Sequence, residues 1–218
     1  MDKLTLVIAN KAYSSWSLRP WLALKLAGAV FEEVVIPLRL PETAALIARW
    51  SPAGKVPVLR HGAVTVWESI AIVEYLAELF PEAHLWPAGP VARAHARTIC
   101  AEMHAGFVPL RSNMTMNLRR RLPGRGRSAE VEKDIARITA MWRDCRARFG
   151  HGGPFLFGAF SNADAMYAPV VTRFETYGVD LDAECRAYAD AVLGLPAMQA
   201  WYADAAAEPW TIAEYEAV

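Results

Sequence analysis

A proline-rich segment over residues 81–91 separates two parts of the chain that have different hydrophobic patterns. Before it, short apolar and β-branched runs alternate with helical stretches. After it, strand patterns fade and apolar residues recur at helical spacing. Three prolines and a glycine favour a connecting segment here. We therefore predict an N-terminal domain over 1–81, a linker over 82–91 and a second domain over 92–218.

The first part predicts an α/β domain. An apolar run and a β-branched run flank a helical stretch, and such a strand–helix–strand unit joins parallel strands. Two later strand patterns flank His61-Gly62 and indicate a hairpin, which adds antiparallel strands. The predicted elements are, in order, strand 4–9, helix 17–27, strand 31–37, helix 42–50, strands 56–60 and 64–67, and helix 69–80.

The second part predicts an all-helical domain. In its clearest stretch, apolar residues recur every three or four positions and form one face that would pack on a core. These residues are Val131, Ile135, Ile138, Trp142, Cys145 and Phe149. Further helices are predicted over 92–118, 161–177, 183–193 and 196–206.

Composition argues against several classes of function. Hydrophobic residues make up 54% of the 218 residues, which is enough for a substantial core. The formal net charge is +0, whereas nucleic-acid binding requires a basic surface, so we expect no nucleic-acid partner. The sequence has no apolar run of membrane-spanning length and no signal-like start. We therefore expect no membrane partner and a cytoplasmic location.

The three cysteines, Cys100, Cys145 and Cys185, are odd in number and far apart. This usage favours a reducing compartment over a disulfide framework. None has a cysteine or histidine partner at zinc-ligand spacing, so we expect no metal site.

Three hydroxyls, from Ser14, Ser15 and Ser17, crowd the turn between the first predicted strand and helix. Such a turn gathers unpaired backbone N–H groups and the positive end of the helix dipole. A hydroxyl there can cap the helix or hold an anion. The residues of this turn alone leave both roles open.

Two further positions suggest ligand contacts. The Val56-Pro57 step opens a strand pattern, where proline marks a sheet edge or a cis bond that turns backbone groups outward. Such exposed groups can pair with an extended peptide. Ser69 follows Glu68 at a helix start, where it can serve as the N-cap. Alternatively, this helix start binds a carboxylate while Glu68 pairs with an ammonium group.

Taken in order, these motifs resemble the glutathione transferase family, over nearly the whole chain. The segment 157–165 adds to the resemblance, because its Ser161 and Asp164 look like the capping box of the family's helical domain. The resemblance implies an α/β plus all-α architecture: a thioredoxin-like, glutathione-binding N-terminal domain, then an all-helical domain. It also implies a homodimer, with a small-molecule electrophile as second substrate.

The serine run is most similar to the serine-type, zeta- and theta-like classes of the family. The zeta class carries Ser-Ser-Cys-Ser-Trp-Arg, and the run here is Ser-Ser-Trp-Ser-Leu-Arg. The match implies that Ser14 is the catalytic hydroxyl, with Ser15 as its main rival and Ser17 as a helix cap. Trp16 stands where the zeta pattern has cysteine, which disfavours zeta-type isomerisation of a dicarboxylate.

The remaining motifs imply the contacts with glutathione, the cosubstrate. Lys55 and the main chain of Val56, beside Pro57, would hold its glycyl and cysteinyl parts. Glu68 and Ser69 would hold its γ-glutamyl end.

The chemistry expected is activation of the glutathione thiol for attack on a small apolar electrophile. A free cysteine thiol has a pKa of about 8.5, and a hydroxyl that donates a hydrogen bond to sulfur favours the thiolate. The helix N-terminus acts in the same direction. The electrophile would bind between the two domains. Its predicted contacts are Phe107, Asn113, Met114 and Asn117, with Val108 and Met116 on the same helix.

Other functions stay open at this stage. They are a glutathione-dependent isomerase of the maleylacetoacetate type, a dehalogenase or ether-cleaving relative, and a non-catalytic glutathione-binding module. The intact Lys55-Val56-Pro57 and Glu68-Ser69 motifs argue against the last of these. No cysteine lies in residues 1–80, so cysteine-type chemistry is disfavoured.

Overall fold

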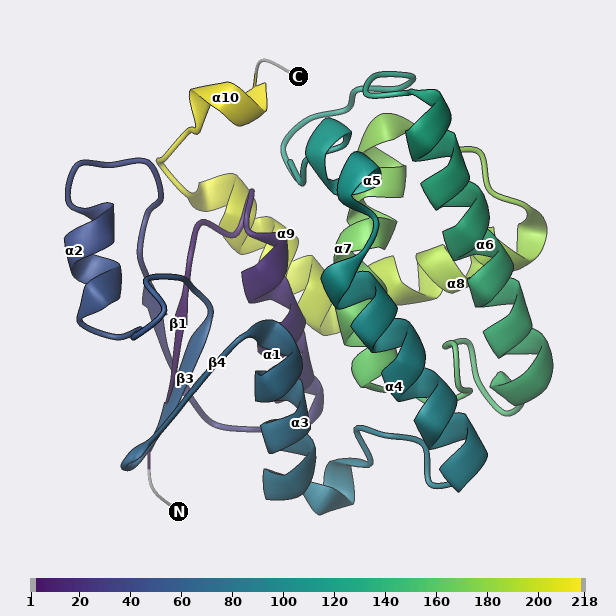
Figure 1. Cartoon of the computed structure of the whole chain (residues 1–218), viewed down its shortest axis with the longest axis horizontal. Coiled ribbons are helices and arrows are strands. Elements are labelled where there is room, and N and C mark those ends of the chain that lie inside the picture. Colours follow the sequence, from purple (N-terminus) through teal and green to yellow (C-terminus); the bar gives the residue numbers. More distant parts are fainter. Residues whose placement is uncertain (1–2, 217–218) are drawn as a thin grey trace.

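The computed structural model, which describes residues 3–216, places a four-stranded sheet beside a group of helices (Figure 1). The strand order is β2-β1-β3-β4. β1 (Leu4–Ile8) pairs in parallel with β2 (Glu32–Val35) and antiparallel with β3 (Val58–His61). β3 pairs antiparallel with β4 (Val64–Trp67). The mixed sheet predicted from the alternating pattern is confirmed.

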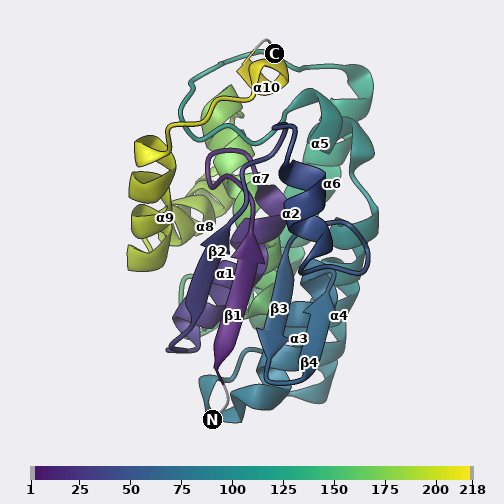
Figure 2. The same cartoon turned by 90° about the vertical axis from the view of Figure 1, so that its left-hand side faces the viewer.

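The sheet is covered on both faces, and every residue of its central strand β1 is buried. Leu6 and Ile8 belong to the main core, together with residues of α1 (Ser15–Leu26) and α3 (Ser69–Leu79). Val7 points to the other face, where it joins a smaller cluster with Ile47 of α2 (Thr43–Ala48). In Figure 2 the sheet faces the viewer, with α1 and α3 behind it.

The second part is helical, as predicted. The described helices after the sheet are α4 (Pro90–Ala105), α5 (Val108–Asn113), α6 (Ala129–Phe149), α7 (Asn162–Tyr177), α8 (Ala183–Leu193), α9 (Pro196–Ala207) and α10 (Ala213–Glu216). α7 is buried along nearly its whole length and packs against α1, α4 and α8. A short 3₁₀ turn, Pro81–Ala83, lies in the connection between α3 and α4.

The single helix predicted over 92–118 is wrong. α4 ends at Ala105, and α5 begins at Val108 after Gly106 and Phe107. A Cβ on Gly106 would lie 2.8 Å from the Glu102 carbonyl oxygen, so the tight helix end requires glycine. Phe107 is left-handed, with φ of 56°, so the backbone does not continue as one α-helix. The break turns α5 toward the N-terminal domain.

Two contacts, one partly buried and one buried, hold the helices against the sheet domain. Lys11 Nζ lies 2.6 Å from Glu33 Oε1 and 2.7 Å from Asp204 Oδ2 of α9, and it also contacts the rings of Trp21 and Trp201. At the other end of the contact, the Asn162 side chain donates a hydrogen bond to the Val73 carbonyl of α3 (2.9 Å). These links hold the helical domain in place against the sheet domain, and so position the residues that lie between the two domains.

The described residues place two further limits on function. None of the helices within residues 3–216 is long and apolar enough to cross a membrane. The same residues bring together no group of three His, Cys, Asp or Glu side chains suited to a metal ion. Cys100, Cys145 and Cys185 are free, buried thiols.

Candidate functional site

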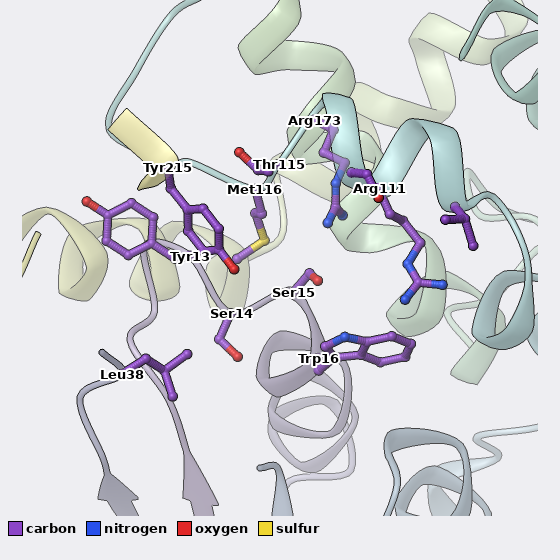
Figure 3. A pocket seen from close by; sticks show the side chains of 12 residues that line it. Tyr13, Ser14, Ser15, Trp16, Leu38, Arg111, Thr115, Met116, Arg173 and Tyr215 are labelled. Carbon is purple, nitrogen blue, oxygen red and sulfur yellow. The ribbon is translucent and has the colours of Figure 1, made fainter. Parts of the chain in front are cut away.

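Two adjoining cavities lie where the N-terminal domain meets the helices. The first, here called the serine cavity, has a volume of about 220 Å³ (Figure 3). It is lined by Tyr13, Ser14, Ser15, Trp16, Leu38, Val108, Arg111, Ser112, Thr115, Met116, Arg173 and Tyr215. The second, the strand-edge cavity, has a volume of about 270 Å³ and is lined by Trp16, Lys55, Val56, Pro57, Trp67, Glu68, Ser69 and Arg111. Trp16 and Arg111 line both.

Ser14 is the N-cap of α1. The Ser17 N–H donates to Ser14 Oγ (3.4 Å), and the Ser14 hydroxyl donates to Ser17 Oγ (2.7 Å). Ser17 Oγ also accepts the Ala9 N–H (3.1 Å), which joins the helix start to the end of β1. The sequence interpretation gave the cap to Ser17 and left Ser14 free, and the structure reverses this. Ser17 is fully buried behind the cap.

Ser15 is the first residue of α1 and lines the serine cavity beside Ser14. Its side chain makes no hydrogen bond to any other residue of the described chain. The first turn of α1 contains no acidic residue, so its backbone N–H groups and dipole have no carboxylate of their own. This helix start is therefore equipped to accept an anion from the cavity.

The strand-edge cavity brings together all five residues predicted to hold glutathione: Lys55, Val56, Pro57, Glu68 and Ser69. Val56-Pro57 is a cis peptide bond at the start of β3. The backbone N–H and C=O of Val56 form no main-chain hydrogen bond within residues 3–216. Glu68, not Ser69, is the N-cap of α3, with a left-handed φ of 66°. Ser69 Oγ is buried without a hydrogen-bond partner in the described structure.

The four residues predicted to contact the electrophile line neither cavity. Phe107 and Met114 are core residues, and Asn113 donates to the Pro109 carbonyl of its own helix (2.8 Å). The Asn117 side chain donates to Glu216 Oε1 of α10 (2.9 Å). Val108 and Met116, the other candidates on this segment, do line the serine cavity, and Arg111, Ser112 and Thr115 line it with them. The break at Gly106 and the non-helical chain after Asn113 change which side chains of the segment face the cavity.

Tyr13 also lines the serine cavity, but its hydroxyl is bound to α10. Its hydroxyl donates to Glu216 Oε1 of α10 (2.7 Å), and burial together with that carboxylate raises the pKa of Tyr13. The hydroxyl is therefore held in its protonated form against α10. Tyr215, next to Glu216, forms part of the cavity wall (Figure 3).

Sequence reasoning missed two arginines in the serine cavity, Arg111 of α5 and Arg173 of α7. Figure 3 shows both side chains extending toward Ser15 and Trp16. The Trp16 ring lies 4.7 Å from the Arg111 guanidinium carbon and 4.1 Å from that of Arg19. No sequence signal marked these arginines, because they lie in helical stretches whose neighbours are core residues.

Comparison with known proteins identifies the two parts of the chain. Residues 13–79 match the family model of the glutathione S-transferase N-terminal domain, and residues 128–204 match that of the C-terminal domain. Together the two ranges cover more than half of the chain.

Relatives by sequence include a "Probable maleylacetoacetate isomerase" of Caenorhabditis elegans, 29% identical over 170 residues, which are 77% of this chain and 78% of that protein. Glutathione S-transferase L1 of Arabidopsis thaliana is 27% identical over 184 residues, 84% of this chain and 70% of that protein.

Solved structures share the whole fold. Glutathione transferase Omega 2S from Trametes versicolor, in complex with 2,4-dihydroxybenzophenone, has a TM-score of 0.74 at 20% identity, over 100% of both chains. A glutathione transferase homologue from Burkholderia, with bound glutathione, has a TM-score of 0.70 at 22% identity, over 94% of this chain and 98% of that one. Since family models match both the sheet domain and the helical domain, the chain belongs to the glutathione transferase family.

Proposed function

We propose that this enzyme binds glutathione in the strand-edge cavity, with its thiol at Ser14 and Ser15, and transfers it to an electrophile in the serine cavity. The observation that supports this most directly is the adjacency of the two cavities, which share Trp16 and Arg111. One cavity contains the five predicted glutathione contacts. The other contains the free hydroxyl and the open helix start.

The strand-edge cavity offers a complementary group for each polar part of glutathione. The buried Ser69 hydroxyl, at the start of α3, suits the γ-glutamyl carboxylate, and Glu68 suits the neighbouring ammonium group. The unpaired main-chain groups of Val56 suit the cysteinyl backbone, as in the addition of a strand to a sheet edge. Lys55 is exposed at the rim and suits the glycyl carboxylate.

At the thiol, the two serines have different hydrogen bonds. The Ser14 hydroxyl already donates to Ser17, whereas the Ser15 hydroxyl has no partner in the described chain. We therefore propose Ser15 as the donor to the thiolate, with Ser14 as the cap that orients the first turn. Lowering a thiol pKa by two units corresponds to about 2.7 kcal/mol. One charge-assisted hydrogen bond, worth about 1.5–3 kcal/mol, supplies most of this.

Calorimetry with glutathione tests the binding step, and absorbance of the bound thiolate against pH tests its activation. We expect saturable binding that Ser69→Ala weakens, and a thiol pKa well below that of free glutathione. No measurable binding would contradict the proposal and leave a module that has only the fold. Normal binding with an unshifted thiol pKa would contradict the activation step alone.

An isomerase of the maleylacetoacetate type is the second candidate, because three of the similar proteins carry that name. A cis–trans isomerase assay on a maleyl compound, with catalytic glutathione, separates it from the transferase. We expect slow isomerisation and faster conjugation. Fast isomerisation without net consumption of glutathione would reverse this ranking. Dehalogenase or ether-cleaving activity would appear as chloride or phenol release from a matching substrate panel.

We also propose that the enzyme is a cytoplasmic homodimer. Val64 on the edge strand β4 is 44% exposed, and such an apolar side chain is suited to cover by a second copy. Light scattering during size-exclusion chromatography would give the mass in solution, and a monomer at micromolar concentration would contradict the dimer. Cell fractionation would test the location.

A further inference from the structure

Three arginines surround the inner end of the serine cavity without a carboxylate partner. Arg111 and Arg173 line the cavity, and Arg19 lies behind Trp16 in the same wall. Arg19 is 1% exposed and Arg173 is 4% exposed. No Asp or Glu oxygen within residues 3–216 lies within salt-bridge distance of any of the three.

Several more exposed arginines of the helical domain do have a carboxylate partner. Arg97, Arg137 and Arg143, which are more exposed, pair with Glu74, Glu102 and Asp182 respectively. Buried charges in proteins are normally paired, because an uncompensated buried charge costs several kcal/mol. Arg19 and Arg173 are nearly fully buried, yet neither has a carboxylate partner in the described chain.

The buried charges also raise one another's energy. Burial, then repulsion from Arg173 and Arg111, lowers the pKa of Arg19 to about 9. Burial, then repulsion from Arg111, lowers the pKa of Arg173 to about 10. Each guanidinium stays protonated at neutral pH, so the wall holds a concentrated positive charge. A bound anion would relieve this repulsion.

The two cavity-lining arginines are held in place and keep donors free. Arg173 donates from Nε to the Met114 carbonyl (2.8 Å) and from Nη1 to the Pro169 carbonyl (3.1 Å). Arg111 donates from Nη1 to the Gly106 carbonyl (3.0 Å). The Nη2 group of each makes no hydrogen bond to another residue in the described chain. Behind them, Nε and Nη1 of Arg19 are buried and unpartnered.

We propose that Arg111 and Arg173 form a subsite for a carboxylate carried by the electrophilic substrate. Leu38, Val108 and Met116 supply the apolar part of the same cavity, where the reacting end of the substrate would lie. Ser15 lies on the wall between the two regions (Figure 3). The substrate class is therefore an apolar electrophile with an anionic group, rather than a wholly apolar one.

This inference rests on the proposed function, since the substrate meets the thiolate of bound glutathione. With an aryl chloride, the sulfur lone pair forms the new S–C bond while the C–Cl bond breaks and chloride leaves with its electron pair. The subsite takes no part in these bond changes. It orients the substrate and offsets the negative charge that the thiolate and the carboxylate bring together.

A matched pair of probes tests the subsite: 4-chloro-3,5-dinitrobenzoate and its neutral methyl ester. Both have the same reacting carbon and leaving group. Because the ester also activates the ring more strongly than the carboxylate, each kcat/KM is divided by the uncatalysed rate of that probe with glutathione. We expect this normalised wild-type kcat/KM to favour the acid over the ester by about tenfold or more. In Arg111→Met this acid-to-ester ratio falls by about 10- to 100-fold, and Arg111→Lys restores part of it.

Arg125→Met is the matched control, because it removes the same charge from an exposed loop outside both cavities. It should leave the ratio unchanged. Arg173→Lys provides a second variant, which keeps the charge but loses the planar fork. A ratio that Arg111→Met and Arg173→Lys both leave at the wild-type value overturns the proposal.

Two further measurements test whether the arginines instead bind a different anion, either a carboxylate of glutathione or its thiolate. If Arg111→Met weakens glutathione binding in calorimetry but keeps the acid-to-ester ratio, the arginine holds a carboxylate of glutathione and the proposal is wrong. If the thiol pKa rises and both probes slow equally, the arginines act on the thiolate, which also overturns it. If the enzyme conjugates neither probe, calorimetry of 4-chloro-3,5-dinitrobenzoate without glutathione tests the subsite directly. Binding lost in Arg111→Met supports the subsite, and no binding to wild type rejects it.

Discussion

The helices α1 and α7 pack against each other, and both begin with a serine N-cap, but their N-termini have different partners. At α7, Ser161 and Asp164 form a capping box, and Asp164 also accepts the Leu156 N–H (3.1 Å). At α1, Ser14 caps the helix, yet no acidic residue stands in the first turn. The first turn of α7 therefore contains its own carboxylate, whereas the first turn of α1 contains none and is free to accept an anion from a ligand.

Burial makes the contrast sharper. Asp164 is fully buried and surrounded by core, whereas Ser14 and Ser15 face the serine cavity. Helix N-termini of equal polarity can therefore serve stability or ligand binding, depending on whether the carboxylate in the first turn belongs to the chain.

The largest expected effect is on stability, at the N-terminus of α7. Asp164→Ala leaves the buried N–H groups of Leu156 and Ser161 without acceptors, and each costs about 1–3 kcal/mol. We expect a loss of about 3 kcal/mol or more in the free energy of unfolding, measured with urea. A loss below about 1 kcal/mol would show that solvent replaces the carboxylate, contrary to its burial.

Asp164 at the N-terminus of α7 should also make stability depend on pH. Burial raises the pKa of Asp164 to about 6, above its unfolded value near 3.8, so the folded state holds this proton more tightly. The contribution is fully present below about pH 4, is lost as pH rises to about 6, and is constant above that. The unfolding free energy of wild type minus that of Asp164→Asn should fall across this window by up to about 3 kcal/mol. A flat difference would contradict the raised pKa.

At the N-terminus of α1, the expected effect is on the pKa of the bound glutathione thiol. Ser15→Ala removes a hydroxyl with no partner in the described chain, so we expect the bound thiol pKa to rise by about 1–2 units. Thiolate absorbance against pH measures this, with Ser112→Ala, another hydroxyl of the same cavity, as control. An unchanged titration would return the role to Ser14 or to the backbone N–H groups.

The smallest expected effects are on the free energy of unfolding, and they distinguish the role of Ser14 from that of Ser15. Ser14→Ala removes the α1 cap and should cost about 1 kcal/mol. Ser15→Ala should change the unfolding free energy by less than about 0.5 kcal/mol, since its hydroxyl bonds to nothing in the fold. Urea unfolding of both variants measures the difference. Equal losses would mean that both hydroxyls belong to the cap.

Much of the fold followed from local pattern. The strands of the mixed sheet, the capping box at Ser161 and the range 183–193 of α8 were predicted from spacing and cap residues, which act within a few positions. The helix over 92–118 was wrong, because the left-handed turn at Phe107 depends on packing that the spacing does not encode. The glutathione-contact residues were recognised as motifs, and the structure places all five on one cavity.

The sequence alone determined the two-part architecture, the family motifs and the hydroxyl-rich helix start, because each depends on residues that are near neighbours in the chain. Only the tertiary structure decided which serine caps α1, which side of the segment 107–117 meets the cavity, and where the buried charge lies. Arg19, Arg111 and Arg173 are distant in sequence. Their shared field arises when α1, α5 and α7 pack together and exclude the water that would otherwise screen it.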